Sequence, residues 1–517
     1  MNDGKICVSV CAETGETLFE NVNKAQELAD VVEVRFDCMS AGRLSEVRSK
    51  ISKSEFIKPL LATFRAPGQG GNGTATRDER LGFWGDGVES FWKFDIEEDI
   101  AGELGHLESC ILSFHDFSGV PYDIDDIFTR LAAAGTDIIK MAVTTADVTD
   151  GLAVWKLMKR AKADGKDLIP IAMGEAGKWT RILGLAHGAV LTYASLDAGG
   201  ETAPGQVSVR DLIDTYRARQ LDMNTRVFGI IGDPVSQSMS PVMQNPAFVA
   251  AGIDAVFIPL LVKDLDAFMR RMVKRESREA ELNFGGFSVT MPHKQTVMKY
   301  LDAIDQTAKM IGAVNTVKIE GDKLTGYNTD SHGFITPLKH HFGELKDAKV
   351  AVAGAGGAAR ACVYALIAEG AEVEILVRDI KRAQHISEEF GISARLISDF
   401  KSGISRSNPK SQKPRPNLSN VDIVVNATPM GMAGPFENES LFTADELEGV
   451  RFVYDLVTKP YDTPIISEAK KAGIPAIGGL EMLVSQGAKQ FEIWTGLVPS
   501  VEMMRQCVLR RMREVRK

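Results

Sequence analysis

Charged side chains stand near the ends of short apolar runs in the N-terminal part of the chain, and two could do covalent and proton-transfer chemistry. Lys140 lies within Asp137–Val143, a run otherwise made mainly of apolar residues. Apolar neighbours disfavour the ammonium form, which frees an amine that can attack a carbonyl carbon. His115 ends the preceding apolar run and could move protons near neutral pH. The pair predicts an amine nucleophile beside a general base.

Simpler interpretations remain for each residue taken alone. Lys140 could extend its ammonium group to the surface or pair with the carboxylate of Glu33, and a single histidine at a strand end is more often structural. Arginines at neighbouring strand ends, Arg35 and Arg65, would suit a carboxylate substrate. The combination therefore favours catalysis over a purely structural role.

The elements that must position these residues are eight short apolar runs. They are Ile6–Val10, Val31–Phe36, Pro59–Phe64, Phe91–Ile96, Cys110–Phe114, Ile138–Val143, Leu168–Met173 and Ala189–Tyr193. Amphipathic stretches of helical period separate most of them, so the strands should be parallel. Eight such units fit a (β/α)₈ TIM barrel, in which catalytic groups lie at the carboxyl ends of the strands. A doubly wound open sheet is the competing architecture.

Five ordered segments then carry a family resemblance: Glu33–Asp37, Thr63–Arg65, Ser113–Phe117, Ile139–Ala142 and Ala203–Ser208. With them, residues 1–223 resemble the type I 3-dehydroquinate dehydratases. The resemblance implies that Lys140 forms a Schiff base with the ring ketone of 3-dehydroquinate and that His115 removes the α-proton. It also implies a substrate pocket lined by Glu33, Arg35, Arg65, Arg181, Thr202 and Gln206. Gln69 stands where many relatives carry Glu, which removes a charge from the loop after Arg65.

A dinucleotide-binding pattern occurs in the second half of the chain. The run Lys349–Ala353 leads into the glycine-rich turn Gly354–Arg360 and then into an apolar, helix-like stretch. A strand, a glycine turn and a helix in this order present backbone N–H groups to a pyrophosphate. The simpler alternative is a turn that only permits close packing. Arg378 and Arg382 after the next strand favour NADP, whereas Asp379 favours NAD.

Polar residues upstream of this turn form another group. Ser238 and Ser240 lie in a turn, where they could simply satisfy backbone groups, and Thr290 ends a predicted strand. A helix predicted to begin at Pro292 would carry Lys294 in its first turn, where the helix dipole favours the neutral amine. Asp330, taken alone, is predicted to cap the helix that follows it.

A second resemblance rests on ordered motifs from Gly232 to Gln486. They are Gly232–Pro241, Val289–Lys294, Gly312–Thr316, Asn328–Asp330, Gly354–Arg360, Asn426–Met432 and Gly479–Gln486. With these motifs, the C-terminal part resembles shikimate dehydrogenase. This implies that Ser238, Ser240, Thr290, Asn315, Asp330 and Gln486 bind substrate, and that Lys294 and Asp330 form the catalytic pair. It places Gly354, Gly356, Gly357, Ala358, Arg378, Arg382, Thr428, Met430 and Gly479 around NADP. Some positions depart from the common pattern: Ser288 replaces Asn, Val377 and Asp379 flank Arg378 where Asn and Thr are frequent, and Thr458 stands where many relatives have Tyr.

The resulting domain division is an α/β chain in four parts. Residues 1–223 form the dehydratase barrel, 224–335 the substrate-binding domain, 336–478 a Rossmann NADP-binding domain, and 479–517 helices that return to the substrate-binding domain. The segment Ser402–Asn420, rich in Ser, Pro, Lys and Arg, should be a solvated loop.

The amino-acid composition argues against some classes of binding partner. The 517 residues are 44% hydrophobic and 25% charged, with a formal net charge of −9. Such a chain lacks the basic footprint of nucleic-acid or anionic-membrane binding, and no apolar stretch is long enough to cross a bilayer. Six scattered cysteines predict neither a disulfide framework nor a zinc site, so we expect no metal and a cytoplasmic location. Whether the chain forms an oligomer stays open.

The two resemblances together imply consecutive reactions: dehydration of 3-dehydroquinate to 3-dehydroshikimate, then NADPH-dependent reduction to shikimate. One alternative is an NAD-preferring quinate/shikimate dehydrogenase with a weak dehydratase. Another is a non-catalytic sensor of pathway metabolites, for which the exchange at Gln69 is the one supporting feature. The presence of Lys140, His115, Lys294 and Asp330 favours the enzyme.

Overall fold

The structure is a computed structural model that describes residues 2–85, 90–104, 107–400 and 418–514. It divides into two compact units, residues 1–241 with 252–293, and residues 242–251 with 294–517. Most of the predicted loop at residues 402–420 lies outside the described residues.

The first unit begins with parallel strands whose interior residues meet across a barrel. The strands are β1 (Lys5–Cys11), β2 (Val31–Arg35), β3 (Leu60–Thr63), β4 (Lys93–Glu97), β5 (Cys110–Asp116), β6 (Ile138–Thr144), β7 (Asp167–Met173) and β8 (Leu191–Ser195). Their order is β7-β6-β5-β4-β3-β2-β1-β8, with the short β9 (Val207–Ser208) beside β8. The Val190 N–H donates to Leu168 O at 3.4 Å, which brings the two ends of the sheet together. Tyr193 on β8 also reaches Asp95 on β4. The predicted α/β class with an N-terminal barrel is confirmed.

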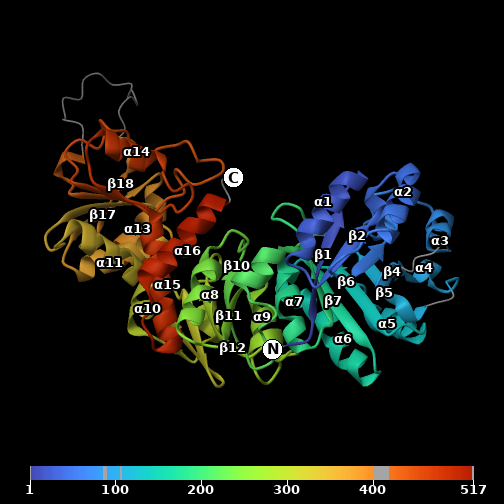
Figure 1. Cartoon of the computed structure of the whole chain (residues 1–517). Helices are drawn as coiled ribbons and strands as arrows, with labels where there is room; N and C mark the ends of the chain where they lie inside the picture. Colours follow the sequence, from blue (N-terminus) through green and yellow to red (C-terminus); the bar gives the residue numbers. More distant parts are fainter. Residues whose placement is uncertain (1, 86–89, 105–106, 401–417, 515–517) are drawn as a thin grey trace. The chain divides into compact units, whose positions relative to one another are not determined.

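Helices cover the outer side of these strands (Figure 1). They are α1 (Gly15–Gln26), α2 (Ala41–Ser52), α3 (Arg77–Gly85), α4 (Glu98–Ala101), α5 (Ile124–Ala133), α6 (Leu152–Ala163) and α7 (Lys178–Leu183). In α5 the buried residues Ile124, Ile127, Phe128 and Leu131 recur at helical spacing. Inside the barrel, Cys7, Ile111, Ile138, Ile169 and Leu191 belong to one apolar cluster near the amino ends of the strands. Polar residues lie at the carboxyl ends of the strands.

Three further parallel strands complete the first unit: β10 (Arg226–Gly232), β11 (Ala255–Leu261) and β12 (Phe284–Val289), with α9 (Leu265–Phe268) after β11. Strand β10 pairs with both of the others. Gly232 ends β10 at φ +155°, and a Cβ there would lie 2.4 Å from Cγ2 of Thr290. Glycine therefore lets the turn after β10 approach the end of β12 closely.

The second unit contains a small set of strands and a nucleotide-binding type of sheet. Strands β13 (Ala303–Ile304), β14 (Thr316–Glu320) and β15 (Lys323–Tyr327) accompany α8 (Ser240–Ala250), most of which belongs to this unit, α10 (Gln306–Ile311) and α11 (Asp330–Phe342). The larger sheet has the order β18-β17-β16-β19-β20-β21 and is parallel. Its strands are β16 (Lys349–Ala353), β17 (Glu372–Val377), β18 (Ser393–Leu396), β19 (Ile423–Asn426), β20 (Phe452–Asp455) and β21 (Ala476–Ile477).

The helices of the larger sheet are α12 (Gly357–Ala368), α13 (Ile380–Phe390) and α14 (Pro464–Lys471), followed by α15 (Gly479–Thr495) and α16 (Val501–Glu514). Helix α15 packs back against the smaller strands. Trp494 Nε1 donates to Val317 O at 3.0 Å, and Gln490 Nε2 donates to Thr316 Oγ1 at 3.0 Å. Gln244 Nε2 of α8 donates to Gly487 O at 2.8 Å.

The prediction that a helix begins at Pro292 is wrong. Residues 291–295 form turns, and a 3₁₀ helix covers only Thr296–Tyr300. The carbonyl of Lys294 accepts the Val314 N–H at 2.7 Å, a bond to a residue distant in sequence instead of one along a helix. The argument that a helix dipole acts on Lys294 therefore does not hold.

Cysteine pairing also differs from the expectation. Cys11 and Cys38 form a disulfide, while Cys7, Cys110, Cys362 and Cys507 are free. The pair is 27 residues apart in sequence, and parallel pairing of β1 with β2 brings it together. In the described part of the chain, no helix has both the length and the apolar character needed to cross a membrane.

Candidate active sites

One cavity at the carboxyl ends of the barrel strands gathers every barrel residue that the sequence singled out. Its lining includes Glu33, Arg35, Arg65, His115, Lys140, Arg181, Thr202 and Gln206. The loop residues Gln69 and Gly70, and the ring of Phe117, lie at the same cavity. Only about 40 Å³ remains free inside it. This free volume is smaller than a substituted six-membered ring.

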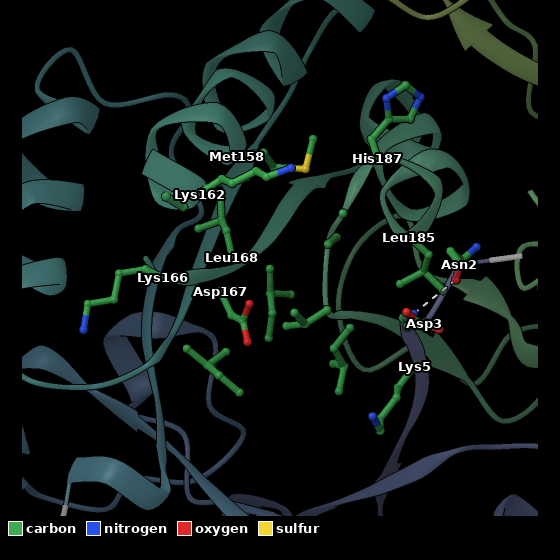
Figure 2. A pocket seen from close by; sticks show the side chains of 18 of the residues that line it. Asn2, Asp3, Lys5, Met158, Lys162, Lys166, Asp167, Leu168, Leu185 and His187 are labelled. Atoms are coloured by element: carbon green, nitrogen blue, oxygen red, sulfur yellow. Dashed lines mark hydrogen bonds between the residues drawn. The ribbon is translucent and has the colours of Figure 1, made fainter. Parts of the chain in front are cut away.

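A larger cavity, of about 680 Å³, opens at the opposite end of the barrel (Figure 2). Lys5 at the start of β1, Asp167 at the start of β7 and Lys162 of α6 lie around it (Figure 2). Lys166 there donates to Thr136 O at 2.6 Å, and the ring of His187 packs on Trp155. The volume of a cavity therefore does not identify the active site, because the catalytic residues of such a barrel lie at the carboxyl ends of the strands.

Lys140 is held by a carboxylate and an aromatic ring. Its Nζ donates to Asp95 Oδ2 at 2.9 Å and lies 3.9 Å from the ring centre of Tyr193. Burial lowers the pKa of Lys140, although the charge of Asp95 opposes that shift. The sequence suggested Glu33 as a partner for Lys140; the Glu33 carboxylate instead accepts from Ser9 and from Thr63 Oγ1, the latter at 2.7 Å.

His115 lies half-buried beside these cations. Burial lowers the pKa of its imidazole, and the positive charges of Arg65 and Lys140 lower it further. Gln69 Oε1 accepts the His115 backbone N–H at 3.1 Å and lies 3.2 Å from Nδ1. An amide oxygen can only accept, so this contact favours a proton on Nδ1 and leaves the lone pair of Nε2 available to accept a proton.

The three arginines of the cavity are not equivalent. Arg35 forms two hydrogen bonds with Asp37, at 2.8 and 2.7 Å. Arg65 pairs with Asp95 and Glu97, both at 2.8 Å. Arg181 is 1% exposed. Within the described part of the chain its guanidinium donates to the backbone carbonyls of Tyr193 and Pro204, at 3.4 Å, and its Nε has no partner. Burial lowers the pKa of Arg181 to about 10. This guanidinium is thus the cation best placed to accept a substrate carboxylate.

The loop that carries Thr202 and Gln206 closes the remaining side. Thr202 N donates to Gln206 Oε1 at 2.8 Å, and Gln206 Nε2 donates to Thr202 Oγ1 at 3.1 Å. Gly205 has φ +72°, and a Cβ there would lie 2.2 Å from Gly174 O. Glycine therefore permits the close contact that fixes these two polar side chains at the cavity.

The second unit contains another lysine–carboxylate pair. Lys294 Nζ donates to Asp330 Oδ2 at 2.6 Å, and Asn315 Nδ2 donates to Asp330 Oδ1 at 2.7 Å. The expectation that Asp330 caps the next helix is wrong: Thr329 is the N-cap residue, and Asp330 lies in the first turn of α11. Gln486 of α15 accepts from Thr329 Oγ1 at 3.5 Å, so it joins the same polar cluster.

The serine and threonine residues predicted for the substrate-binding domain lie in the first unit. Ser238 Oγ accepts the Ser240 N–H at 3.2 Å, which fixes the turn after β10. Thr290 follows β12, and its N–H donates to Ile231 O of the adjacent β10 at 2.9 Å. These side chains therefore lie at the carboxyl ends of two paired parallel strands, together with the buried Ser288.

The glycine-rich turn lies at the carboxyl end of β16. Gly356 is the N-cap of α12, and a Cβ at Gly356 or Gly357 would meet open space. Gly354 has φ +115°, and a Cβ there would lie 2.6 Å from Ala427 O. The exposed N-terminus of α12 thus has room for a phosphate, with Ala358 in its first turn.

Other predicted cofactor residues surround this edge. Thr428 Oγ1 donates to Asn426 Oδ1 at 2.6 Å and accepts the Met430 N–H at 3.2 Å. Gly479 packs so tightly that a Cβ would lie 2.3 Å from Leu456 O. Arg378 and Arg382 are exposed. Asp379 Oδ1 accepts the Lys381 N–H at 3.0 Å as the N-cap of α13, so its carboxylate has a structural role.

The sequence predicted no role for two residues of the site. Asp95 lies in the predicted strand Phe91–Ile96 and Tyr193 ends the predicted strand Ala189–Tyr193, yet both contact Lys140. A carboxylate inside an apolar run could have identified Asp95 from the sequence. No feature of the sequence singles out Tyr193. Among the described residues, no group of three or more His, Cys, Asp or Glu side chains is arranged to hold a metal ion.

Comparison with known proteins accounts for both halves. Residues 6–223 match the family described as Type I 3-dehydroquinase. Residues 230–317 match the shikimate dehydrogenase substrate binding domain, 337–408 the shikimate / quinate 5-dehydrogenase family and 479–509 the shikimate 5'-dehydrogenase C-terminal domain. The chloroplastic bifunctional 3-dehydroquinate dehydratase/shikimate dehydrogenase of Arabidopsis thaliana is 32% identical over 97% of this chain and 84% of its own length.

The chain belongs to the family of bifunctional 3-dehydroquinate dehydratase/shikimate dehydrogenases. Single-activity relatives of this family match the second half alone. The shikimate dehydrogenase (NADP(+)) of Methanocaldococcus jannaschii is 38% identical over 56% of this chain and 98% of its own length. A crystal structure of the Thermus thermophilus enzyme with NADP(H) and shikimate shares 33% identity over 55% of this chain and 99% of that chain, with a TM-score of 0.47.

The environment of His115 predicts the direction of a charge effect. Its pKa lies well below the ordinary value of 6.5, in part because the Lys140 ammonium is near. Lys140→Met removes that charge, so the pKa of His115 should rise. Titration of carbon-13-labelled histidine by NMR measures it, with His115→Asn used to assign the signal. Lys162→Met, at the other end of the barrel, should leave the pKa unchanged. An unchanged or lower value in Lys140→Met would contradict this electrostatic account.

Proposed function

We propose that the barrel dehydrates 3-dehydroquinate to 3-dehydroshikimate and that the C-terminal half reduces this product to shikimate with NADPH. The observation that carries the dehydratase proposal is one cavity holding the buried Lys140, His115 and a guanidinium without a carboxylate partner, Arg181. The names of the relatives support the same pair of reactions. The two activities would be consecutive, since the product of the first is the substrate of the second.

In the dehydratase, the amine of Lys140 attacks the ring ketone after losing a proton, and loss of water gives an iminium. Burial lowers the pKa of Lys140 and so makes the neutral amine easier to reach. Nε2 of His115 then removes the α-proton, and the electron pair moves into the iminium. The resulting imidazolium returns its proton to the departing hydroxyl, which leaves as water. Hydrolysis of the new iminium releases the product and restores Lys140.

The substrate would be oriented by charge and by hydrogen bonds. We assign the carboxylate to Arg181, because Arg35 and Arg65 already pair with Asp37, Asp95 and Glu97. Polar groups of Glu33, Arg35, Arg65, Thr202 and Gln206 would contact the ring hydroxyls. Such fixed dipoles and charges act strongly in a cavity with little room for water.

In the dehydrogenase, Lys294 would donate a proton to the ketone oxygen as hydride arrives at the carbon. Asp330 holds the ammonium group at 2.6 Å, and Asn315 holds Asp330 in turn. Ser238, Ser240, Thr290, Asn315 and Gln486 would bind the hydroxyls and carboxylate of the substrate. NADPH supplies the hydride when bound. The open space above Gly356 and Gly357 fits its pyrophosphate, and Arg378 and Arg382 would face the 2′-phosphate.

Several broader assignments belong to the same proposal. The functional division is 1–223, 224–335, 336–478 and 479–517, and the ligands are small carboxylates and the dinucleotide, with neither nucleic acid nor membrane as partner. We propose the cytoplasm as its compartment: four of its six cysteines are free thiols, and the Cys11–Cys38 disulfide is the exception to this pattern. An oligomer is compatible with the proposal and is not required by it.

The two lysines predict separable losses of activity. Lys140→Ala should abolish dehydration and spare reduction, whereas Lys294→Ala should abolish reduction and spare dehydration. A coupled assay with 3-dehydroquinate and NADPH, plus direct addition of 3-dehydroshikimate, distinguishes the steps by nicotinamide absorbance. Dehydration that survived in Lys140→Ala would exclude the Schiff base. Wild-type protein that binds both substrates tightly without turnover would favour a metabolite sensor.

Arg181 gives a test of substrate binding. Arg181→Met should raise the KM for 3-dehydroquinate about 30-fold, since loss of one partner from a buried charge pair costs about 2 kcal/mol or more. The free energy of unfolding should stay equal or increase, because an unpaired buried charge is removed. Arg210→Met, an exposed arginine on the same half, is the matched control. An unchanged KM would place the carboxylate elsewhere.

Arg378 tests the preference for NADPH. Arg378→Ala should raise the KM for NADPH about tenfold and leave that for NADH unchanged, as expected for one lost charge-assisted hydrogen bond. The neighbouring exposed cation Lys381, changed to Ala, serves as the control. Kinetics of the wild type with NAD, NADP, quinate and shikimate belong to the same experiment. A strong preference for NAD and quinate would support the quinate/shikimate alternative instead.

A further inference from the structure

The disulfide of the barrel lies at its catalytic end. Cys11 is the last residue of β1, and Cys38 ends the short 3₁₀ helix Phe36–Cys38 that follows β2. Both residues are half-buried, which leaves the sulfur pair within reach of a small reagent. The free thiols of Cys7 and Cys110 in the same barrel are buried. The bond therefore links the end of β1 to the segment after β2, at the carboxyl end of the barrel strands.

The disulfide contacts the loop that covers the cavity, residues 66–72. Asn72 Nδ2 donates to Sγ of Cys11 and to Sγ of Cys38, each at 3.4 Å. The backbone N–H of Asn72 donates to Asp37 Oδ2 at 2.9 Å. One end of the covering loop is thus attached to the sulfur pair and to the residue that precedes Cys38 in the chain.

Asp37 transmits this attachment to the substrate-binding arginines. Its carboxylate holds Arg35 by two hydrogen bonds and accepts the backbone N–H of Arg65 at 3.3 Å. The guanidinium of Arg35 also donates to Gly70 O of the loop at 3.4 Å. A shift of Cys38 therefore acts on Asp37, on Arg35 and on the loop together.

The other end of the covering loop lies against catalytic groups. Gln69 contacts His115, and a Cβ on Gly70 would lie 2.2 Å from the ring of Phe117. The free space beneath is only about 40 Å³. The loop position thus determines both the hydrogen bond to His115 and access to Lys140.

We propose that Cys11 and Cys38 form a reversible oxidation site, through which dithiol reductants loosen the cover of the dehydratase cavity. A thiolate of the dithiol attacks one sulfur and forms a mixed disulfide; its second thiol then displaces that cysteine. Cys11 and Cys38 gain two electrons and two protons, and the reductant becomes a disulfide. An oxidised dithiol drives the reverse reaction with the same balance.

Reduction has a structural consequence because two thiols cannot stay at bonding distance. The two sulfur atoms would move apart, so that Asn72 could no longer contact both of them in one geometry. In the oxidised form, therefore, the loop of residues 66–72 is held over the cavity and the Asp37–Arg35 ion pair is fixed in place. The reduced form should bind 3-dehydroquinate more weakly. The dehydrogenase half contains none of these residues, so it should not respond.

The test uses the full chain and rests on the proposed dehydratase function. The protein is equilibrated with oxidised or reduced dithiothreitol, and thiols at Cys11 and Cys38 are counted by mass spectrometry. Reduction should raise the KM for 3-dehydroquinate about fivefold, the factor of one lost hydrogen bond. NADPH-dependent reduction of 3-dehydroshikimate, measured on the same samples, should be unchanged. Absence of dehydration in the oxidised wild type would contradict the proposed function itself.

Variants test whether the Cys11–Cys38 disulfide itself causes the change in KM. Cys11→Ser and Cys38→Ser should behave like the reduced wild type and ignore dithiothreitol, while Cys507→Ser should keep the full response. Asn72→Ala should raise the KM even when the disulfide is intact, because it removes the link to the loop. Equal KM values for the oxidised and reduced wild type, or a response that persists in Cys11→Ser, would overturn the proposal. So would thiols that stay reduced in oxidised dithiothreitol.

Discussion

The dehydratase site depends on one buried carboxylate, that of Asp95. Its Oδ2 accepts from Lys140 at 2.9 Å, from Arg65 at 2.8 Å and from Tyr193 at 3.4 Å. Burial raises the pKa of Asp95, but the charges of Arg65 and Lys140 outweigh it and lower the pKa overall. Strands β4, β6 and β8 and the segment just after β3 contribute to this contact, so the geometry of the cavity is set from across the barrel. Without Asp95, the buried Lys140 would lose its carboxylate partner, and Arg65 would lose one of the two carboxylates that balance its charge.

Both halves of the chain use a lysine beside a carboxylate, and burial distinguishes their chemistry. The side chains of Lys140 and Asp95 are 6% and 0% exposed, whereas those of Lys294 and Asp330 are 25% and 9% exposed. A nucleophilic amine benefits from the dry surroundings of Lys140, which favour its neutral form. In the proposed reduction Lys294 gives up a proton in each turnover and must regain one, and its partial exposure would allow exchange with water. The same pair of residue types therefore suits two different reactions.

The sequence was sufficient for the parallel strands and for the residues at their carboxyl ends, because alternation of strands and helices fixes both. Residues that meet across the barrel were not predictable in this way. The contact of Tyr193 with Lys140 depends on how the closed sheet is tilted, which no local pattern encodes. The same holds for Cys11 and Cys38. Lys294 and Asp330 show the converse failure: local helix rules suggested roles that tertiary hydrogen bonds to Val314 and Asn315 replaced.

Recruitment of anionic ligands by a chain of net charge −9 needs cations that are both local and uncompensated. Arg35 and Arg65 are local, but their charges are balanced by Asp37, Asp95 and Glu97, so they mainly shape the cavity. Among the residues that the structure describes, Arg181 has no carboxylate partner to offset the cost of its burial. A substrate carboxylate would regain that cost on binding, because it supplies the missing charge and hydrogen bonds. Affinity would then come from a charge that the folded barrel leaves unpaired, independent of the overall charge of the protein.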